Sequence, residues 1–508
     1  MATLTKSKAV GSKAAKAPRL QQFIDGRWIE GVGRKEIVSS SPSDTRRTVA
    51  VVQGASREDA LRALDAAQAA LPKWKAVPAP QRGRILQKFV ELARARKEEL
   101  ARLMSLEQGK ILPEAMGEME KGINLVEWFA GEGMRLMGVA APSELHSNLL
   151  YTLRQPLGVV SVITPWNFPW AIPCWKIAPA LVGGNTVVFK PASLVPALSV
   201  EFVKLWEQAG VPAGVLNLVI GAGSEIGNLL VEDKRVRAVT FTGSNSVGKG
   251  VHTIAGARGI KVVCEMGGKN PCVVMDDADL DLALAGVVKG AFGATGQRCT
   301  ATSRLLLHDK IADRFLEMVL RSAKAIRVGD ALDPKSGMGP AVDEGQLQTD
   351  LDYIRFAQED GARLLCGGRR LSEGDLAHGF FVEPTVFDGV TTKMRLWKEE
   401  VFGPVLAVTR FSTYEQALSL ANDCEFGLTS AIYTQNLTLA MRFADDIESG
   451  MTHINSPTIG GEAQVPFGGI KGSGVGEREM AKEGMNFFTE LKTVFLDYTG
   501  RKRDSSIY

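Results

Sequence analysis

The chain has 508 residues, more than one ordinary hydrophobic core accommodates, so we expect two or three domains. Hydrophobic residues make up 45% of it and charged residues 23%, the balance of a globular protein in water. The formal net charge is +3, which for this length argues against nucleic acid or an anionic membrane as a partner.

The ends and the cysteines narrow the class further. No apolar run is long enough to span a bilayer, and the basic first twenty residues lack the apolar core of a secretory signal. We expect residues 1–20 to form a disordered basic tail, with an organelle transit segment as the alternative. The 6 Cys and 5 His are scattered without metal-ligand spacing, which favours a reducing, cytoplasmic compartment and no metal site.

Apolar residues at helical spacing predict mostly helix over 57–137, and residues 138–156 are predicted as loop followed by strand. From residue 157 the pattern changes to short β-branched runs separated by amphipathic stretches such as 195–210. The runs are 157–163, 185–190, 216–220, 238–242 and 261–266. This alternation predicts an α/β fold with a Rossmann-like parallel sheet, whose ligands bind beyond the carboxyl ends of the strands.

A second α/β unit is predicted from about residue 268 to the Gly-rich segment near 465–476. The run 492–498 predicts a late strand after that unit is complete. We expect it to pair either with 138–156 or with the sheet edge of a neighbouring subunit.

Three motifs contain candidates for catalysis. Cys299, in GQRCTA, is a candidate nucleophile, although a lone cysteine is more often a buried core residue. Glu265 ends a predicted strand before two glycines, as a general base or as a surface turn residue. Asn167, held between aromatic residues in TPWNFP, is either an oxyanion-hole amide or a helix-capping turn residue.

Other motifs suit a dinucleotide. FTGSNSVGKG predicts strand, turn and helix, so Gly243 and Ser244 would offer backbone N–H groups to a pyrophosphate. Lys190 ends another strand and suits ribose hydroxyls, while the GxGxxxG cluster containing Gly223 is predicted to approach the adenine. Glu400 and Phe402 are expected on one side of an extended segment, facing the nicotinamide half, or in an acidic turn before a strand.

Taken together, the motifs PWNFP, FTGS, EMGGK, GQRCTA, EEVFGP and PFGGIKGSG resemble the aldehyde dehydrogenase superfamily from about residue 21 to 497. The resemblance implies Cys299 as nucleophile, Glu265 as the base for the deacylating water, and Asn167 in the oxyanion hole. It implies NAD or NADP as cofactor, a small aldehyde as substrate, and a homodimer or homotetramer. The implied cofactor-binding residues are Ile163, Thr164, Trp166, Lys190, Ser193, Gly223, Gly243, Ser244, Glu400 and Phe402.

The resemblance also implies three structural parts. The cofactor-binding domain would comprise 21–137 and 157–267, and the catalytic domain 268–467. A small β oligomerisation element would comprise 138–156 and 483–497.

Cofactor and substrate preference depend on fewer residues. Many NAD-specific relatives carry Glu at the position of Ser193, so we expect NADP to be used at least as well as NAD. The chain is most similar to the α-ketoglutarate-semialdehyde (2,5-dioxovalerate) and succinate-semialdehyde dehydrogenase group. It lacks the Arg residues that succinate-semialdehyde dehydrogenases carry at the positions of Trp175 and Gly293. Three arginines remain candidates for binding a substrate carboxylate: Arg154, Arg298 and Arg304.

Several alternatives stay open at this point. Succinate semialdehyde or a broad range of aldehydes would also fit the motifs. A CoA-acylating aldehyde dehydrogenase is disfavoured by Glu265, which those enzymes generally lack. A non-enzymatic binding protein on the same fold is disfavoured because Cys299 and Asn167 are both present.

Overall fold

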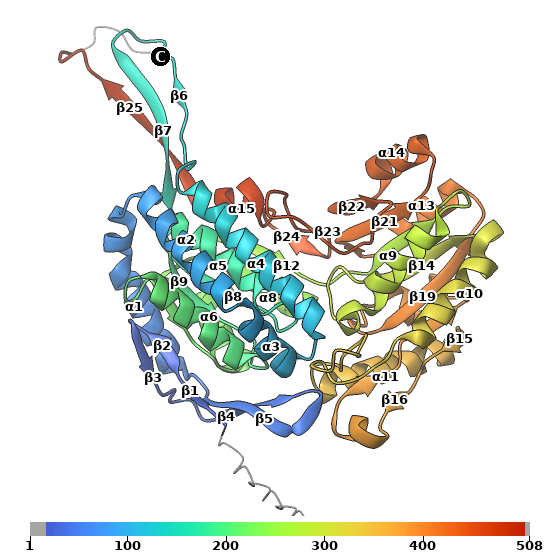
Figure 1. Cartoon of the computed structure of the whole chain (residues 1–508). Coiled ribbons are helices and arrows are strands. Elements are labelled where there is room, and N and C mark those ends of the chain that lie inside the picture. The colour runs from blue at the N-terminus through green and yellow to red at the C-terminus, as the bar shows by residue number, and fades with distance from the viewer. Residues whose placement is uncertain (1–16, 503–508) are drawn as a thin grey trace, which may run out of the picture.

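The first α/β unit forms an eight-stranded sheet in the order β24-β12-β11-β8-β9-β10-β2-β3 (Figure 1). The five strands from β12 to β10 are parallel, and β24, β2 and β3 add antiparallel pairs at the two edges. Their bounds are β2 Gln22–Ile24, β3 Arg27–Ile29, β8 Val159–Ile163, β9 Thr186–Lys190, β10 Leu216–Leu218, β11 Val236–Thr242, β12 Lys261–Glu265 and β24 Gly474–Val475. Each of the five predicted runs overlaps a strand of this sheet. The computed structural model describes residues 17–502.

Helices cover both faces of this sheet, as the continuous apolar run of β8 requires. Val160 and Val162 face a layer that includes α2, α4, α5 and α6, whereas Val159 packs in the opposite layer with α1 and α8. Helix α1 begins at a capping box formed by Ser56 and Asp59. The helices are α1 Arg57–Ala76, α2 Ala79–Ala95, α3 Lys97–Gln108, α4 Leu112–Glu132, α5 Ala171–Val182, α6 Pro196–Ala209, α7 Leu229–Glu232 and α8 Asn245–Ala257.

The second unit forms a seven-stranded sheet in the order β15-β18-β19-β14-β13-β21-β22, parallel except for β15. Its strands are β13 Asn270–Val274, β14 Thr302–His308, β15 Arg363–Cys366, β18 Thr385–Asp388, β19 Val405–Phe411, β21 Thr429–Tyr433 and β22 Met451–Ile454. Its helices are α9 Leu280–Phe292, α10 Asp309–Ala325, α11 Glu344–Glu359, α12 Arg395–Lys398, α13 Tyr414–Asn422 and α14 Leu437–Asp446. Short pairs join β16 Arg370–Leu371 to β17 Phe381–Val382, and β20 Phe426–Gly427 to β23 Ile470–Lys471.

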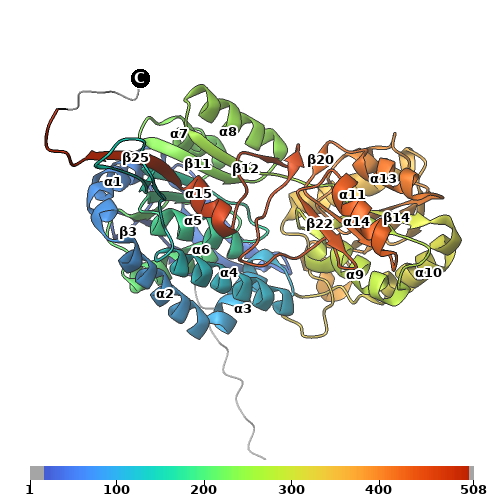
Figure 2. The same ribbon diagram turned by 90° about the horizontal axis from the view of Figure 1, so that it is seen from above.

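A three-stranded arm projects from the first unit and stands clear of the rest of the molecule in Figure 1; in Figure 2, seen from above, it lies in front of that unit. It consists of β6 Ala140–Ala141, β7 Asn148–Pro156 and β25 Thr489–Asp497, the last of which follows α15 Ala481–Phe487. Strand β25 pairs antiparallel with β7 along its whole length, so the first of the two predicted pairings for the late strand is confirmed.

The N-terminal segment differs from the prediction. Residues 1–16 of the predicted tail lie outside the described part of the chain, but Arg19–Leu20 forms β1. It pairs in parallel with β5 Asp44–Gln53, which in turn pairs with β4 Glu36–Ser41. The proposed tail boundary at residue 20 is therefore too late, because backbone pairing and ion pairs from Arg19 to Glu30 and Glu36 fix this segment.

Strand β24 returns the chain to the first sheet after the second unit is complete. The predicted division into domains assigned residues 468–482 to no part, and here this stretch supplies β23, β24 and the start of α15. The domain boundaries themselves remain a prediction. No helix within 17–502 is long and apolar enough to cross a membrane.

Candidate active site

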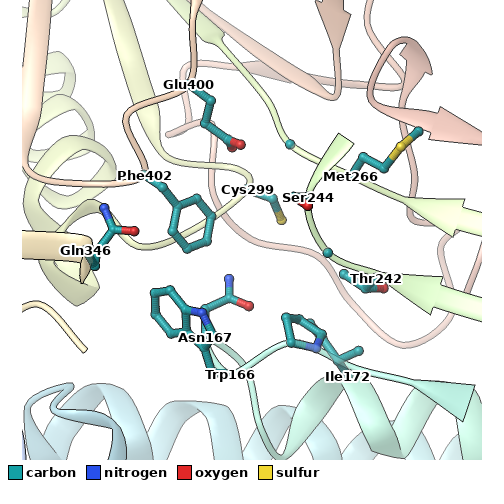
Figure 3. A pocket seen from close by; sticks show the side chains of 13 residues that line it. Trp166, Asn167, Ile172, Thr242, Ser244, Met266, Cys299, Gln346, Glu400 and Phe402 are labelled. Carbon is teal, nitrogen blue, oxygen red and sulfur yellow. The ribbon is translucent and has the colours of Figure 1, made fainter. Parts of the chain in front are cut away.

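Two cavities meet at Cys299, between the two α/β units. The first, of about 250 Å³, is drawn in Figure 3, where the Cys299 sulfur and the Asn167 amide both point into it. The second, of about 470 Å³, opens on the other side of the same cysteine. Cys299, Ile172 and Thr242 line both cavities. The structure therefore places one nucleophilic side chain where two separate ligands would meet.

A tight turn just before Cys299 fixes its position. Ala294, Thr295 and Gly296 all have positive φ, and a Cβ at Gly296 would lie 2.2 Å from the Gly403 carbonyl oxygen. Only glycine tolerates both this close approach and a φ of +68°. Asn270 Nδ2 donates to the Cys299 carbonyl at 2.7 Å, which ties the turn to the start of β13.

The resting thiol is protonated at neutral pH. Burial raises the pKa of Cys299 to about 12, and the carboxyl groups of Glu400 and Glu265 raise it further, while Lys121 opposes them. A thiolate is the reactive form, so the thiol needs a neighbouring positive charge or a base before it can attack.

Asn167 belongs to the loop after β8, and a buried ion pair holds this loop. Lys110 Nζ donates to the Asn167 carbonyl at 2.7 Å and pairs with Glu118. Glu118 Oε1 accepts the backbone N–H groups of Trp170 and Ala171, at the N-terminus of α5. The Asn167 Nδ2 group donates to the Gln297 carbonyl at 3.1 Å, two residues before Cys299. The Asn167 amide thus lies beside Cys299, on a backbone that Lys110 fixes through the Asn167 carbonyl.

Glu265 ends β12 and lines the second cavity. It is 2% exposed, and its Oε2 atom has no hydrogen-bond partner among the described residues. Burial, and then the nearby Glu479, raise the pKa of Glu265 well above its usual value. Such a carboxyl group is a stronger base than an ordinary carboxylate once it loses its proton.

The first cavity has the features that a dinucleotide requires. Helix α8 begins next to Gly243 and Ser244 with no side-chain cap, so its first N–H groups are free to bind phosphate. Glu400 accepts the Gly268 N–H at 2.8 Å, and burial raises the pKa of Glu400 to about 7. The rings of Trp166 and Phe402 meet edge to face, with centroids 5.4 Å apart (Figure 3).

One expectation about this cavity was wrong in detail. Glu400 and Phe402 both line it, but not as alternate residues of an extended segment. Phe402 has a φ of +61°, in the left-handed region, because the chain turns sharply before Gly403. The predicted neighbours therefore come together through a turn.

Comparison of this chain with known proteins agrees with the geometry of the site. Residues 28–494 match the model of the aldehyde dehydrogenase family. The alpha-ketoglutaric semialdehyde dehydrogenase of Bacillus subtilis (strain 168) is 45% identical over 474 residues, covering 93% of this chain and 97% of that protein. The 2,5-dioxopentanoate dehydrogenase of Saccharolobus solfataricus is 40% identical, covering 93% and 98%.

A solved structure of betaine aldehyde dehydrogenase from Staphylococcus aureus in complex with NAD+ superposes with a TM-score of 0.92. It is 34% identical to this chain and covers 95% of each. The chain belongs to the aldehyde dehydrogenase family. It is an NAD(P)-dependent oxidoreductase that acts on aldehydes.

Five of the predicted cofactor residues of this aldehyde dehydrogenase line neither cavity: Ile163, Thr164, Lys190, Ser193 and Gly223. Ile163 and Lys190 end the neighbouring strands β8 and β9, so they lie at the carboxyl edge of the sheet, as does Thr164. Ser193 Oγ donates to the Gly221 carbonyl at 3.1 Å, which brings the loop with Gly223 to the same edge. Their roles remain predictions.

Sequence reasoning did not select several lining residues of the aldehyde dehydrogenase. These are Ile172, Thr242, Met266 and Gln346 in the first cavity, and Glu118, Lys121 and Lys289 in the second. Residues such as Lys121 lie within helices whose pattern indicates only an amphipathic surface. Two of the three candidate arginines do not line the second cavity: Arg154 bonds Thr489 in the arm, and Arg304 donates to four backbone carbonyls. Arg298 does line it.

Within residues 17–502, no three His, Cys, Asp or Glu side chains gather into a possible metal site. All six cysteines of the aldehyde dehydrogenase are free thiols.

Proposed function

We propose that this aldehyde dehydrogenase oxidises a small semialdehyde, such as α-ketoglutarate semialdehyde, through an acyl thioester on Cys299. The observation that carries the proposal is the position of Cys299 at the junction of the two cavities, with Asn167 and Glu265 lining them on either side. One cavity would hold the nicotinamide half of the dinucleotide and the other the aldehyde.

Cys299, Asn167 and Glu265 would each act at a different step of the oxidation. The Cys299 sulfur, once deprotonated, attacks the aldehyde carbon, and the new C–S bond leaves an alkoxide. The Asn167 amide and the Cys299 backbone N–H stabilise that alkoxide. When NAD(P) is bound, it accepts the hydride whose loss leaves a thioester on Cys299. Glu265 then removes a proton from water, which attacks the thioester carbon and frees the carboxylic acid and the thiol.

The first cavity and the adjoining sheet edge would hold the dinucleotide. The free N–H groups at the start of α8 suit the pyrophosphate, and Glu400 and Phe402 suit the nicotinamide half. Lys190 suits the adenosine ribose, because it is 6% exposed and forms no ion pair within 17–502. Within 17–502 its ammonium group donates one hydrogen bond, to the Pro191 carbonyl at 3.3 Å.

The volume and walls of the second cavity support a short substrate. Aromatic and branched side chains surround the approach to the cysteine: Phe168, Ile172, Trp175, Ile459 and Phe467. Three cationic side chains, Lys121, Lys289 and Arg298, line the same cavity, which would suit a negatively charged far end. Two relatives named for α-ketoglutarate semialdehyde or 2,5-dioxopentanoate, at 45% and 40% identity, support this substrate class.

We also infer that the active form is a homodimer or homotetramer in the cytoplasm. The arm exposes apolar side chains that a single chain does not bury, including Leu149, Leu491 and Phe495. An exposed apolar surface on a projecting sheet is typical of a subunit contact. The free cysteines support a reducing compartment.

The test compares Cys299→Ala with the wild-type enzyme, with Cys424→Ala as the control because Cys424 is also a half-buried free thiol. We expect Cys299→Ala to form no measurable NAD(P)H from α-ketoglutarate semialdehyde, while calorimetry shows nucleotide binding within about threefold of the wild type. Cys424→Ala should keep its turnover. Full turnover by Cys299→Ala would refute the assignment.

A further inference from the structure

Six charged side chains line the second cavity, three of each sign: Glu114, Glu118, Glu265, Lys121, Lys289 and Arg298. Their pairing decides which of them is available to a ligand. A buried charge that already has a partner and satisfied hydrogen bonds contributes little to binding, whereas an unpaired one attracts an opposite charge strongly.

None of the three carboxyl groups is available to pair with Lys121 or Lys289. Glu114 pairs with Arg298 at 3.2 Å and accepts the Ala294 N–H at 2.7 Å. Glu118 is bound by Lys110 and by two backbone N–H groups, as described above. Burial and the nearby Glu479 raise the pKa of Glu265 well above its usual value, which disfavours its charged form. None of them forms a hydrogen bond or ion pair with Lys121 or Lys289, although Glu118 is close enough to raise the pKa of Lys121.

Two of the three cationic side chains are left without a carboxylate partner. Arg298 pairs with Glu114 through one guanidinium nitrogen, and its Nε has no hydrogen-bond partner within 17–502. Lys121 and Lys289 have no side-chain hydrogen bond or ion pair to any residue of 17–502. Lys121 is half-buried on α4, whereas Lys289 is exposed near the end of α9. The inner cation is thus Lys121, and Lys289 lies nearer to solvent.

The surroundings of Lys121 favour an anion. Its ammonium nitrogen lies 5.4 Å from the ring centroid of Trp175 and 5.8 Å from that of Phe467. It also approaches the loop at Gly461, where a Cβ would lie 3.7 Å from the nitrogen. Burial lowers the pKa of Lys121, and Arg298 also lowers it, whereas Cys299 and Glu118 raise it. A carboxylate bound there would therefore remove an electrostatic cost as well as form new bonds.

We propose that Lys121 binds the distal carboxylate of the substrate, with Lys289 attracting the same anion at the entrance. This rests on the proposed function and names the group that selects the substrate class. The ligand is an aldehyde with a carboxylate, or an anion of similar shape, at its far end. The aromatic rings of Trp175 and Phe467 would flank the carbon chain between the two ends.

Trp175 and Gly293, the two positions where succinate-semialdehyde dehydrogenases carry arginine, have other surroundings here. The Trp175 indole N–H donates to Glu479 at 2.7 Å, so this side chain is fixed as part of the wall. A side chain at Gly293 would meet Glu114 and Arg298, with a Cβ 3.2 Å and 3.3 Å from their nearest atoms. The Glu114–Arg298 pair fills that space, and the free cation lies on α4 instead.

The experiment measures kcat/KM for pairs of aldehydes of equal length, one anionic and one neutral: 5-oxopentanoate with pentanal, and succinic semialdehyde with butanal. It compares the wild type with Lys121→Met, Lys121→Arg and Lys88→Met. The last is a control on α2, where Lys88 pairs with Glu91 at the surface. Met has nearly the length of Lys, so the apolar packing is retained.

We expect Lys121→Met to lower kcat/KM for the anionic aldehydes about 30-fold, mainly through KM, because a hydrogen bond to a charged group is lost. The neutral aldehydes should change less than about threefold, and Lys121→Arg should recover most of the loss. Lys88→Met should behave as the wild type.

Three results would overturn part of this account, and they differ. If the wild type does not prefer anionic aldehydes to neutral ones, the proposed substrate class is wrong. If it does, but Lys121→Met keeps the same preference, the carboxylate binds elsewhere. If Lys121→Met lowers kcat/KM equally for anionic and neutral aldehydes, Lys121 acts on the Cys299 thiol and not on the substrate.

Discussion

At the scale of single residues, burial shifts the proton equilibria of the side chains around the cofactor edge. It raises the pKa of Glu400 to about 7, and it lowers the pKa of Lys190 to about 8 and of Lys269 to about 7. The charge of each group therefore changes within the range of an ordinary assay. Ligand charges that approach these groups shift the same equilibria, so binding and pH are linked.

Lys190 gives a test of cofactor preference. Its ammonium group is charged below a pH of about 8 and loses its charge as the pH rises through that value. NADP carries a 2′-phosphate that this charge would attract and NAD does not, so the ratio of their kcat/KM values should fall about three- to tenfold between pH 7 and 9.5. Steady-state kinetics at matched ionic strength measures it.

A matched variant separates this effect from a general loss of activity. Ser193→Glu places a carboxylate where it would repel a phosphate, so it should lower kcat/KM for NADP by at least about tenfold and leave that for NAD nearly unchanged. A wild-type enzyme that strongly prefers NAD at pH 7 would contradict the expected use of NADP.

The same scale shows where sequence reasoning ends. Cys299, Asn167 and Glu265 could be selected because each lies in a short motif at the end of a predicted strand or loop. Lys121 and Lys110 could not, since a lysine on an amphipathic helix or at a helix end normally faces solvent. Their positions follow from how α4 packs across the loop after β8, which depends on long-range contacts.

At the scale of elements, α3, α4 and α5 meet at the buried Lys110–Glu118 pair. Helix α3 ends at Gln108, and the φ of +97° at the next residue, Gly109, turns the chain so that Lys110 points inward. Glu118 on α4 accepts two backbone N–H groups at the start of α5. The Lys110 ammonium donates to Glu118 and to the Asn167 carbonyl, and it lies over the ring of Phe168. The pair therefore joins three helices to the loop that holds the oxyanion amide.

Removing one member of this pair should affect both stability and rate. Lys110→Met leaves the Glu118 carboxylate buried without a counter-ion, at a cost of about 3–5 kcal/mol in the free energy of unfolding. It also frees the Asn167 backbone, so kcat should fall by up to about 100-fold, the lower end of the effect of losing one oxyanion donor. Chemical denaturation and steady-state kinetics measure the two effects.

The double variant Lys110→Met with Glu118→Gln is the control. It removes the unpaired charge of Glu118 but does not restore the hydrogen bond that Lys110 donates to the Asn167 carbonyl. We expect it to recover most of the stability and little of kcat. Recovery of both would show that Lys110 only neutralises Glu118.

The regular elements were largely predictable, and their ends were not. Each predicted β-branched run overlaps a strand, since buried parallel strands require continuous apolar residues. Phe402 and β24 were missed or misdescribed for a physical reason. A left-handed residue and a two-residue edge strand depend on a neighbouring backbone rather than on local periodicity.

At the scale of the whole molecule, the chain crosses between the two sheets twice, and both crossings border the site. The first passes through 266–269, after Glu265, and the second through β23 and β24, next to β12. Residues from both units therefore line one cavity: Glu400 and Cys299 from the second, and Asn167 and Thr242 from the first. The site exists only when the two units are held together.

The central claim is that Cys299 becomes acylated between these two units. The Glu265→Gln variant, which should form the thioester and hydrolyse it slowly, is mixed with NAD(P)+ and succinic semialdehyde, acid-quenched, and weighed intact. We expect a mass increase equal to one succinyl group, located by peptide mapping on Cys299 and absent without nucleotide. An enzyme that turns over but shows no adduct at any time, or one on another residue, would contradict the account.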